Sequence, residues 1–355
     1  MTRRIVSFED FRDAVSAYRL PRVLLTALEL NLFTKVGERT WTIPELAGDL
    51  KVSERGLAIL CRNLAMAGVL LKKGDRYRNS QLGATALNAN HPAYRGSYLE
   101  LIKNHSKDWL RLLESVQSGL PIDHDVPDSP DWRRQFTWAM HHRTLETAPA
   151  IAKRINLRRA RTLLDLGGGP GTYAMAFLAR NPHLQATVCD REAALEVAKE
   201  IAAAHRAGRR LSYLPVDFTK APIPGTYDVI WYSNVLHIYS PEENRAVFRR
   251  ALEALNPGGR LIIQDAFLHD REGLYPAEAS LFAVSMLLFT EEGNTYSARE
   301  TAKWLKDTGF GRVTLLRIKR EIEDWEDGIL QAVAPGSPPG TTGRQIRSRG
   351  SSRGR

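Results

Sequence analysis

The clearest pattern of apolar and polar positions along the chain lies in residues 162–190, which read TLLDLGGGPGTYAMAFLARNPHLQATVCD. A short apolar run at 163–166 predicts a buried strand, and the glycines after it predict a tight turn. A segment with helical spacing, a second apolar run at 186–189 and the acid Asp190 follow. This order of strand, glycine turn, helix and strand is typical of the start of a nucleotide-binding α/β domain.

The same alternation continues toward the C-terminus. Further strands are predicted at 211–214, 228–233 and 260–266, with helices between them, which implies a mainly parallel sheet. Helices at about 276–289 and 298–308 come next, and then strands at 312–318 and 328–333. Ligands of such sheets bind beyond the carboxyl ends of the strands. The polar residues near these ends are Asp165, Asp190, Asp217, His237 and Asp265.

Helical spacing dominates the beginning of the chain. Residues 8–33 predict two helices that separate near Pro21. Thr42, with proline and glutamate in the next three positions, predicts a capped helix, and Ser53 predicts the cap of another. A hairpin is expected at 69–78, so this region contains two helices followed by a hairpin.

Helix, helix and hairpin resemble a winged helix, which suggests two possible functions. In a DNA-binding role the helix at 53–67 would enter the major groove. It offers only Arg55, Arg62 and Asn63 as base readers, among mostly apolar neighbours. A packing or dimerisation module is therefore the favoured interpretation.

The middle of the chain predicts helices at 98–119 and 132–155, with a loop that contains three prolines at 121–130 between them. Aromatic residues and methionine at helical spacing form a core more often than a ligand pocket, so both interpretations stay open. The candidates for a pocket are Phe136, Met140 and His141.

The glycine turn lets a ligand approach the backbone, because a side chain there would collide with it. Asp190 can accept hydrogen bonds from both hydroxyls of a ribose. Asp165 comes just before the first glycines, where its charge would repel a pyrophosphate and attract a ligand with an ammonium and a sulfonium group. The turn therefore favours S-adenosylmethionine over NAD. The alternative for Asp165 is an acid that only caps the turn.

Composition limits the class of protein. Of 355 residues, 43% are hydrophobic and 25% are charged, which is enough for a sizeable core in two domains. No apolar run reaches the length of a membrane span, and the N-terminus lacks the apolar core of a signal peptide, so we expect a cytoplasmic protein. The two cysteines lie in apolar segments without metal-ligand spacing, so no metal is expected.

Half of the formal charge of +10 comes from the end of the chain. Five arginines and no acid lie in the last dozen residues. Residues 335–355, rich in proline, glycine, serine and arginine, predict a disordered basic tail. A role in RNA binding would depend on this tail alone, so the sequence argues against nucleic acid as the main partner.

Six motifs, in order and spacing, resemble class I S-adenosylmethionine-dependent O-methyltransferases of the type that includes plant caffeate, bacterial polyketide and acetylserotonin methyltransferases. The motifs are Asp165-Leu-Gly-Gly-Gly-Pro-Gly171, Cys189-Asp190, Val216-Asp217-Phe218, Tyr227-Asp228-Val229, Ser233-Asn-Val-Leu-His237 and Asn256-Pro-Gly-Gly-Arg-Leu-Ile-Ile263. The resemblance covers nearly everything except the tail.

This resemblance implies an α/β fold: a Rossmann-like methyltransferase domain with a mostly parallel seven-stranded sheet, preceded by a mainly helical, winged-helix-like dimerisation domain. We therefore expect a homodimer. The expected segments are a dimerisation domain at 1–95, a helical connector that contributes to the substrate pocket at 96–160, the S-adenosylmethionine-binding domain at 161–334, and the tail at 335–355.

The resemblance also implies roles for individual residues. The cofactor would lie against the glycine turn, with Asp190 on its ribose, Asp217 at its adenine amino group and Phe218 against the adenine ring. Phe136 and Met140 match residues that line the substrate pocket of the family, and His141 lies beside them. The implied cofactor-binding residues are Asp165, Gly167, Gly169, Asp190, Asp217, Phe218 and Ser233.

His237 matches the general base of the family, and Asp265 matches the acid that orients it. A phenol of pKa ~10 is about a thousandfold under-ionised at pH 7, a penalty of about 4 kcal/mol that a base can remove. A neutral imidazole can accept the proton. Ile238 and Tyr239 stand where the family often has Asp-Trp, and Thr295 stands where it has a second flanking acid.

Together these observations predict an O-methyltransferase that moves the methyl group by direct in-line transfer to a hydroxyl of a small, aromatic molecule. Transfer to nitrogen or carbon is the alternative within enzymes, because it would not need His237 as a base. A DNA-binding regulator that retains the cofactor fold is the alternative outside them.

Overall fold

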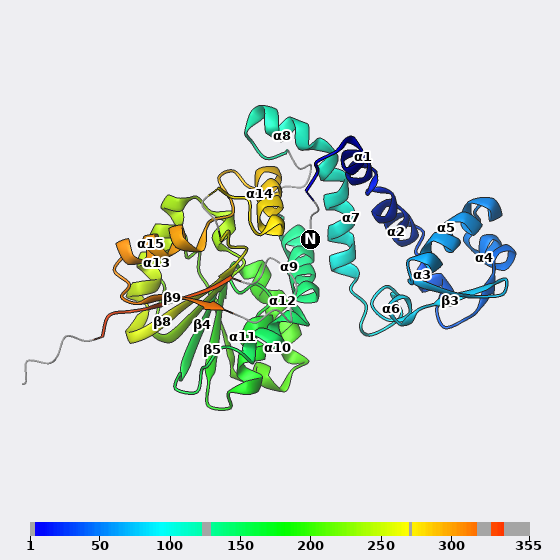
Figure 1. The fold of residues 1–355 in the computed structure, drawn as a ribbon. Coiled ribbons are helices and arrows are strands. Elements are labelled where there is room, and N and C mark those ends of the chain that lie inside the picture. Colours follow the sequence, from blue (N-terminus) through cyan, green and yellow to red (C-terminus); the bar gives the residue numbers. More distant parts are fainter. Residues whose placement is uncertain (1–3, 123–128, 270–271, 318–327, 337–355) are drawn as a thin grey trace, which may run out of the picture.

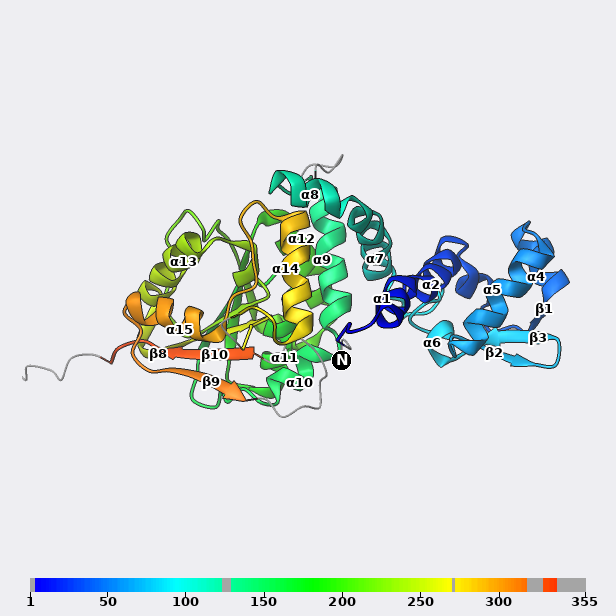
Figure 2. The ribbon, with the colours of Figure 1, turned by 45° about the horizontal axis from the view of Figure 1, so that its top comes forward.

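The computed structural model describes residues 4–122, 129–269, 272–317 and 328–336. Its largest element is a seven-stranded sheet with the strand order β6-β5-β4-β7-β8-β10-β9. Figures 1 and 2 show helices on both faces of this sheet and the N-terminal helices extending away from it. The strands are β4 (Thr162–Leu166), β5 (Gln185–Asp190), β6 (Leu211–Pro215), β7 (Tyr227–Ser233), β8 (Leu255–Asp265), β9 (Val313–Arg317) and β10 (Gly328–Val333).

The sheet confirms the predicted mostly parallel arrangement. The five neighbouring strands β6, β5, β4, β7 and β8 run parallel to one another. β10 runs antiparallel to both β8 and β9. Strands such as β4 and β7 are buried almost throughout, because helices cover both faces. Figure 1 shows α10, α11 and α12 on one face and α13 and α15 on the other.

Two hydrophobic cores fill the space between the sheet and these helices. Phe177 and Trp231 meet edge to face in one core, with ring centroids 5.0 Å apart. Phe248 and Trp304 lie in the other core. The covering helices are α10 (Thr147–Ala152), α11 (Thr172–Arg180), α12 (Glu192–Ala203), α13 (Pro241–Glu253) and α15 (Ala298–Asp307), with 3-10 turns η2 (Arg206–Arg210) and η3 (Leu236–Ile238).

β8 begins earlier than predicted. We expected the segment Pro257-Gly258-Gly259 to be a turn before the strand, but the strand already starts at Leu255. Leu255 pairs with Tyr227, and the next pair along joins Arg260 to Val229, so the extra residues of β8 bulge out between the two pairs. Gly258 supplies the required left-handed conformation, with φ of +75°.

Two long helices expected in the middle of the chain are each divided. The first consists of α7 (Gly96–Asp108), a 3-10 turn η1 (Trp109–Arg111) and α8 (Leu112–Ser118). The second consists of α9 (Pro130–Thr144) and α10, with the break at 145–146. Pro149 explains this second break, because its ring would collide with the carbonyl of Leu145 in a continuous helix. Farther along the chain, α14 (Ala277–Phe289) contacts α8.

The N-terminal helices are α1 (Phe8–Ser16), α2 (Arg19–Glu29) and α3 (Leu32–Val36). The expected boundary near Pro21 is wrong by a few residues, because the break falls at 17–18. Pro21 lies in the first turn of α2. The N–H that proline lacks has no acceptor within the helix at that position, so Pro21 does not interrupt it.

The predicted winged-helix pattern is present beyond α3. It contains β1 (Trp41–Thr42), α4 (Ile43–Leu50), α5 (Glu54–Met66), β2 (Leu70–Lys73), β3 (Arg76–Asn79) and α6 (Gln81–Ala84). The Thr42 capping box is confirmed, with the Thr42 N–H donating to Glu45 Oε2 at 2.8 Å. The Ser53 cap is also confirmed, since its Oγ accepts from Gly56 N. The short strand β1 pairs with β3 and was not predicted.

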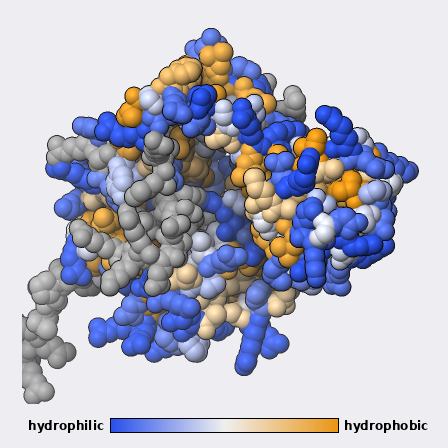
Figure 3. Space-filling model, turned by 45° about the vertical axis from the view of Figure 1, so that its right-hand side comes forward, coloured by the Kyte–Doolittle hydropathy of each residue, from blue (hydrophilic) through white to orange (hydrophobic). Residues whose placement is uncertain are grey.

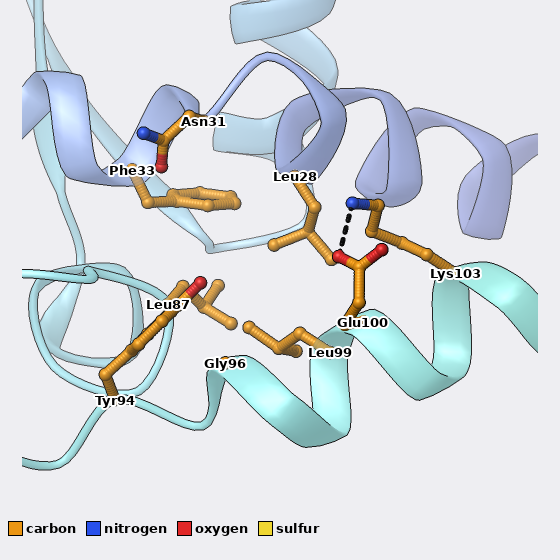
Figure 4. Close-up of a pocket in the computed structure, with 9 residues that line it drawn as sticks. All are labelled: Leu28, Asn31, Phe33, Leu87, Tyr94, Gly96, Leu99, Glu100 and Lys103. Carbon is orange, nitrogen blue, oxygen red and sulfur yellow. Dashed lines mark hydrogen bonds and ion pairs between the residues drawn. The ribbon is translucent and has the colours of Figure 1, made fainter. Parts of the chain in front are cut away.

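α7 connects this region to the rest of the protein. Figure 4 shows the pocket between α7 and the helices α2 and α3, where Leu28 and Phe33 face Leu99. Lys103 and Glu100 form an ion pair of 2.7 Å at its rim. The pocket is therefore a junction between helices, and none of the predicted site residues lines it.

Substitution of Asn79 by Ala tests the anchoring of β3 to α3. The buried Asn79 amide donates to Phe33 O at 2.8 Å and to Gly37 O at 2.9 Å. Its loss leaves both carbonyls without this donor, so we expect the free energy of unfolding to fall by about 1–3 kcal/mol in a urea titration. Asn63→Ala is the control, because the Asn63 amide donates to Ile59 O at the surface. Equal effects of the two substitutions would contradict this interpretation.

Candidate active site

The polar residues predicted to form a site meet at the carboxyl edge of the parallel strands. β4 ends at Leu166 and β5 at Asp190, and β7 and β8 end beside each other with Ser233 paired to Gln264. Because parallel strands all end at the same edge, side chains distant in sequence lie together there. The predicted residues at this edge are Asp165, Asp190, Asp217, Phe218, Ser233, His237 and Asp265.

The glycine turn after β4 has the backbone conformation that glycine permits. Gly167, Gly169 and Gly171 all have positive φ, between +47° and +68°. A Cβ added at Gly167 would lie 2.8 Å from Val235 Cγ2, so the close approach of Val235 also requires glycine. A Cβ added at Gly169 would meet no described atom within 4 Å. The backbone at Gly169 therefore faces open space that a ligand could occupy.

Asp190 is tied to the same turn. Its Oδ2 accepts a hydrogen bond from Gly169 N at 2.8 Å, and its Oδ1 accepts one from Arg191 N at 2.7 Å. Burial raises the pKa of this carboxyl, while the two backbone hydrogen bonds and the nearby Arg133 lower it. Each oxygen keeps a further lone pair, so the carboxylate can still accept hydrogen bonds from a ligand.

Asp165 lies beneath the turn. Its side chain is buried, and its Oδ2 accepts from Ala174 N, in the first turn of α11, at 3.2 Å. Burial raises the pKa of Asp165 to about 7. The structure thus shows Asp165 holding the turn against the start of α11, and the attraction of a cationic cofactor stays a prediction.

The segment after β6 carries Asp217 and Phe218. Asp217 Oδ1 accepts from Thr219 N at 3.1 Å and from Thr219 Oγ1 at 2.5 Å, and these bonds lower the pKa of its carboxyl. Phe218 is buried, with Tyr232 and Tyr239 edge-on to its ring at 6.4 Å. Their contacts with an adenine stay predictions.

Ser233 belongs to a polar network that the sequence did not reveal. Its hydroxyl donates to Gln264 Oε1 at 3.1 Å and accepts from Asn234 Nδ2 at 3.0 Å. Asn234 has a left-handed backbone with φ of +56°, and its N–H donates to Gln264 O. The network joins the ends of β7 and β8 just before His237. No sequence signal could have identified Gln264, since its role depends on which strands become neighbours.

His237 and Asp265 form a buried pair. The His237 Nδ1 lies 2.8 Å from Asp265 Oδ1, which also accepts from Ala266 N at 2.8 Å. Both side chains are nearly inaccessible to solvent. The ring of Phe282, from α14, meets the His237 ring edge to face at 4.8 Å. Phe282 was missed because nothing in the sequence relates α14 to the end of β7.

The three candidates on α9 have different surroundings. Phe136 is half-buried and stacks on Trp132, with ring centroids 5.1 Å apart, and Met140 is also half-buried. His141 is buried, and its Nδ1 lies 2.8 Å from Thr172 Oγ1 at the start of α11. Burial lowers the pKa of His141 to about 4. His141 therefore contacts the helix that follows the glycine turn, and contact of all three residues with a substrate stays a prediction.

Within the described part of the chain, every helix is too short or too polar to cross a membrane. The expected tail lies largely outside the described residues, because the structure describes the chain only as far as residue 336.

Two family models match the chain. One describes an O-methyltransferase domain and matches residues 112–311, and the other describes an O-methyltransferase dimerisation domain and matches residues 13–89. The 3-hydroxy-5-methyl-1-naphthoate 3-O-methyltransferase of Streptomyces sahachiroi is 31% identical over 311 residues, which span 83% of this chain and 87% of that protein.

Solved structures show the same fold. An O-methyltransferase family protein from Burkholderia thailandensis is 26% identical with a TM-score of 0.82, and the match covers 94% of this chain and all of that one. Human N-acetylserotonin methyltransferase in complex with S-adenosylmethionine is 20% identical with a TM-score of 0.79, covering 94% of this chain and 99% of that one, a likeness that shows the fold alone.

These matches confirm the predicted fold class and cofactor. One chain contains the dimerisation domain first and then the seven-stranded sheet with its glycine turn, as the resemblance implied. The chain belongs to the family of S-adenosylmethionine-dependent O-methyltransferases.

Proposed function

We propose that this enzyme methylates a hydroxyl of a small aromatic molecule, with His237 as the general base. The observation that carries the proposal is the buried pair of His237 and Asp265 at the carboxyl edge of the sheet. A carboxylate at Nδ1 holds the ring in one orientation and favours the tautomer with the proton on that nitrogen. Nε2 then keeps its lone pair and can accept a proton from the acceptor.

The residues of the glycine turn fit the cofactor. The open space at Gly169 allows a ligand to approach the backbone, and Asp190 offers two carboxylate oxygens beside it. We assign Asp190 to the ribose, Asp217 and Phe218 to the adenine, and Asp165, Gly167 and Ser233 to the support of this site. When bound, S-adenosylmethionine supplies an electrophilic methyl group, which we propose passes directly and in line to the acceptor oxygen.

An aromatic acceptor suits the apolar residues near His237. Phe282, on α14, meets the imidazole ring, and Phe136 and Met140 are half-buried on α9, which contacts the helix α11 after the glycine turn. Aromatic rings and methionine favour flat apolar ligands. We propose that these side chains hold the ring of the acceptor while His237 takes the proton from its hydroxyl.

We further propose that the enzyme is a homodimer with residues 1–95 as its dimerisation domain. We assign 161–334 to the cofactor-binding domain and 96–160 to a helical connector that contributes to the substrate pocket, with exposed apolar helices beside the dimerisation domain. In the described chain α1 buries none of its own residues, and Phe8 is 81% exposed. In Figure 3 apolar side chains are exposed among polar ones at the top of the molecule, where α8 lies in Figure 1. The exposed apolar residues of these helices include Phe8, Phe11, Val15, Tyr18, Leu110, Leu113 and Val116. So much exposed apolar surface is typical of an interface.

Replacement of Asp190 by Ala tests the cofactor site. We expect it to weaken binding of S-adenosylhomocysteine at least tenfold in calorimetry, because a charged hydrogen bond contributes about 1.5–3 kcal/mol. NADH should not bind the unaltered protein. Asp307→Ala, at an exposed ion pair on α15, is the control. Unchanged affinity of the Asp190 variant would contradict the assignment.

Replacement of His237 by Ala tests the base. We expect kcat for a phenol to fall by about 10²–10⁴, with unchanged affinity for S-adenosylhomocysteine. The loss should shrink for more acidic phenols, because they are already ionised. Asp265→Asn should lower kcat in the same direction, whereas His205→Ala, at an exposed histidine, should not. The same loss for all phenols would argue against proton transfer to His237.

The double substitution Phe8→Asp and Phe11→Asp tests the dimer. We expect light scattering to give about twice the chain mass of 39.9 kDa for the unaltered protein and a single chain for the variant, because charges in an apolar interface are costly. Leu315→Asp, at an exposed leucine of β9 in the cofactor-binding domain, should stay dimeric. A monomeric unaltered protein would overturn the proposal.

A further inference from the structure

The hydrogen bond between His141 and Thr172 joins α9 to the cofactor side of the molecule. Both side chains are more than nine-tenths buried, and the distance from Nδ1 to Oγ1 is 2.8 Å. The Trp138 ring meets the His141 ring edge to face at 5.7 Å and so fixes its position. The bond is thus sheltered from water, and a hydrogen bond in such a buried environment is stronger than one exposed to water.

Thr172 is the first residue of α11, directly after the glycine turn. Its N-cap residue, Gly171, has φ of +68° and offers no side chain to cap the helix. Two buried contacts from elsewhere hold this helix start instead. Asp165 accepts from Ala174 N, and His141 contacts the Thr172 hydroxyl.

The other end of α9 is joined to the helix that follows Asp190. Arg134 donates to both oxygens of Glu200, on α12, at 2.7 Å. Both of these side chains are about half exposed, so the pair contributes little by itself. α9 is therefore fixed to the helices after β4 and β5, and the buried fixing point is at Thr172.

We propose that His141 is a positioning residue for the cofactor: through Thr172 it holds the first turn of α11, and with it the glycine turn, in the conformation that binds S-adenosylmethionine. The expected contact of His141 with the acceptor stays a separate prediction. Because Phe136 and Met140 lie on the same helix, the bond also keeps the proposed acceptor residues in register with the cofactor turn. The inference rests on the proposed place of the cofactor at the glycine turn, and it does not require His237 to act as a base.

The substitution Thr172→Val removes the hydroxyl and keeps the shape of the side chain. We expect calorimetry to show about fivefold to tenfold weaker binding of S-adenosylhomocysteine, and the KM for S-adenosylmethionine to rise with it. Thr172→Ser retains the hydroxyl and should bind within about twofold of the unaltered protein, since the bond is kept. Thr137→Val, at a buried threonine whose hydroxyl donates to Arg133 O within α9, is the matched control and should leave binding unchanged.

Variants of His141 test the other side of the bond. His141→Phe should weaken S-adenosylhomocysteine binding as Thr172→Val does, and the two together should weaken it no further, because they break the same bond. His141→Asn should bind S-adenosylhomocysteine more tightly than His141→Phe, because the asparagine amide can lie near the position of Nδ1.

Two results would overturn the proposal. One is unchanged binding by Thr172→Val with a lowered melting temperature, which would make the bond a structural contact only. The other is full additivity of the two losses. Binding of S-adenosylhomocysteine requires neither an acceptor nor His237, so a failure of the proposed base would leave this result intact.

Discussion

The structure depends on how unpaired backbone N–H groups are satisfied where the parallel strands end. At this edge the ladder hydrogen bonds stop, and buried donors need other acceptors. Carboxylates provide them: Asp190 accepts from Gly169 N and Arg191 N, and Asp265 accepts from Ala266 N. The acids of the site thus hold its loops in place before any ligand is bound.

The side chains to which we assign chemistry thus also have a structural role. Asp265 uses one oxygen for both its own strand end and the imidazole of His237. The backbone therefore fixes the position of Asp265, and Asp265 in turn orients the imidazole ring of His237. Hydrogen bonds from the backbone to a side chain of the site, as at Asp265, make the site rigid with few additional residues.

The sequence contained enough information for most of the fold and for the outline of the site. The central strands such as β4 and β7 could be predicted because both of their faces are buried, and the caps at Thr42 and Ser53 because a capping residue acts within its own turn. The break before α10 was missed although Pro149 marks it. The contacts of His141 with Thr172 and of Phe282 with His237 could not be predicted, because they depend on how helices pack against the sheet.

The place of β10 in the sheet has a consequence for how the protein is made. Among the described residues β10 is the last strand, yet it lies between β8 and β9 and pairs with both. During synthesis, β8 therefore waits with one side unpaired until residue 333 has left the ribosome. Gly328 is the partner of Asp265 in this pairing. The backbone neighbour of Asp265 therefore joins the sheet only after β10 has been synthesised, later than the parallel strands that carry the other residues of the candidate site.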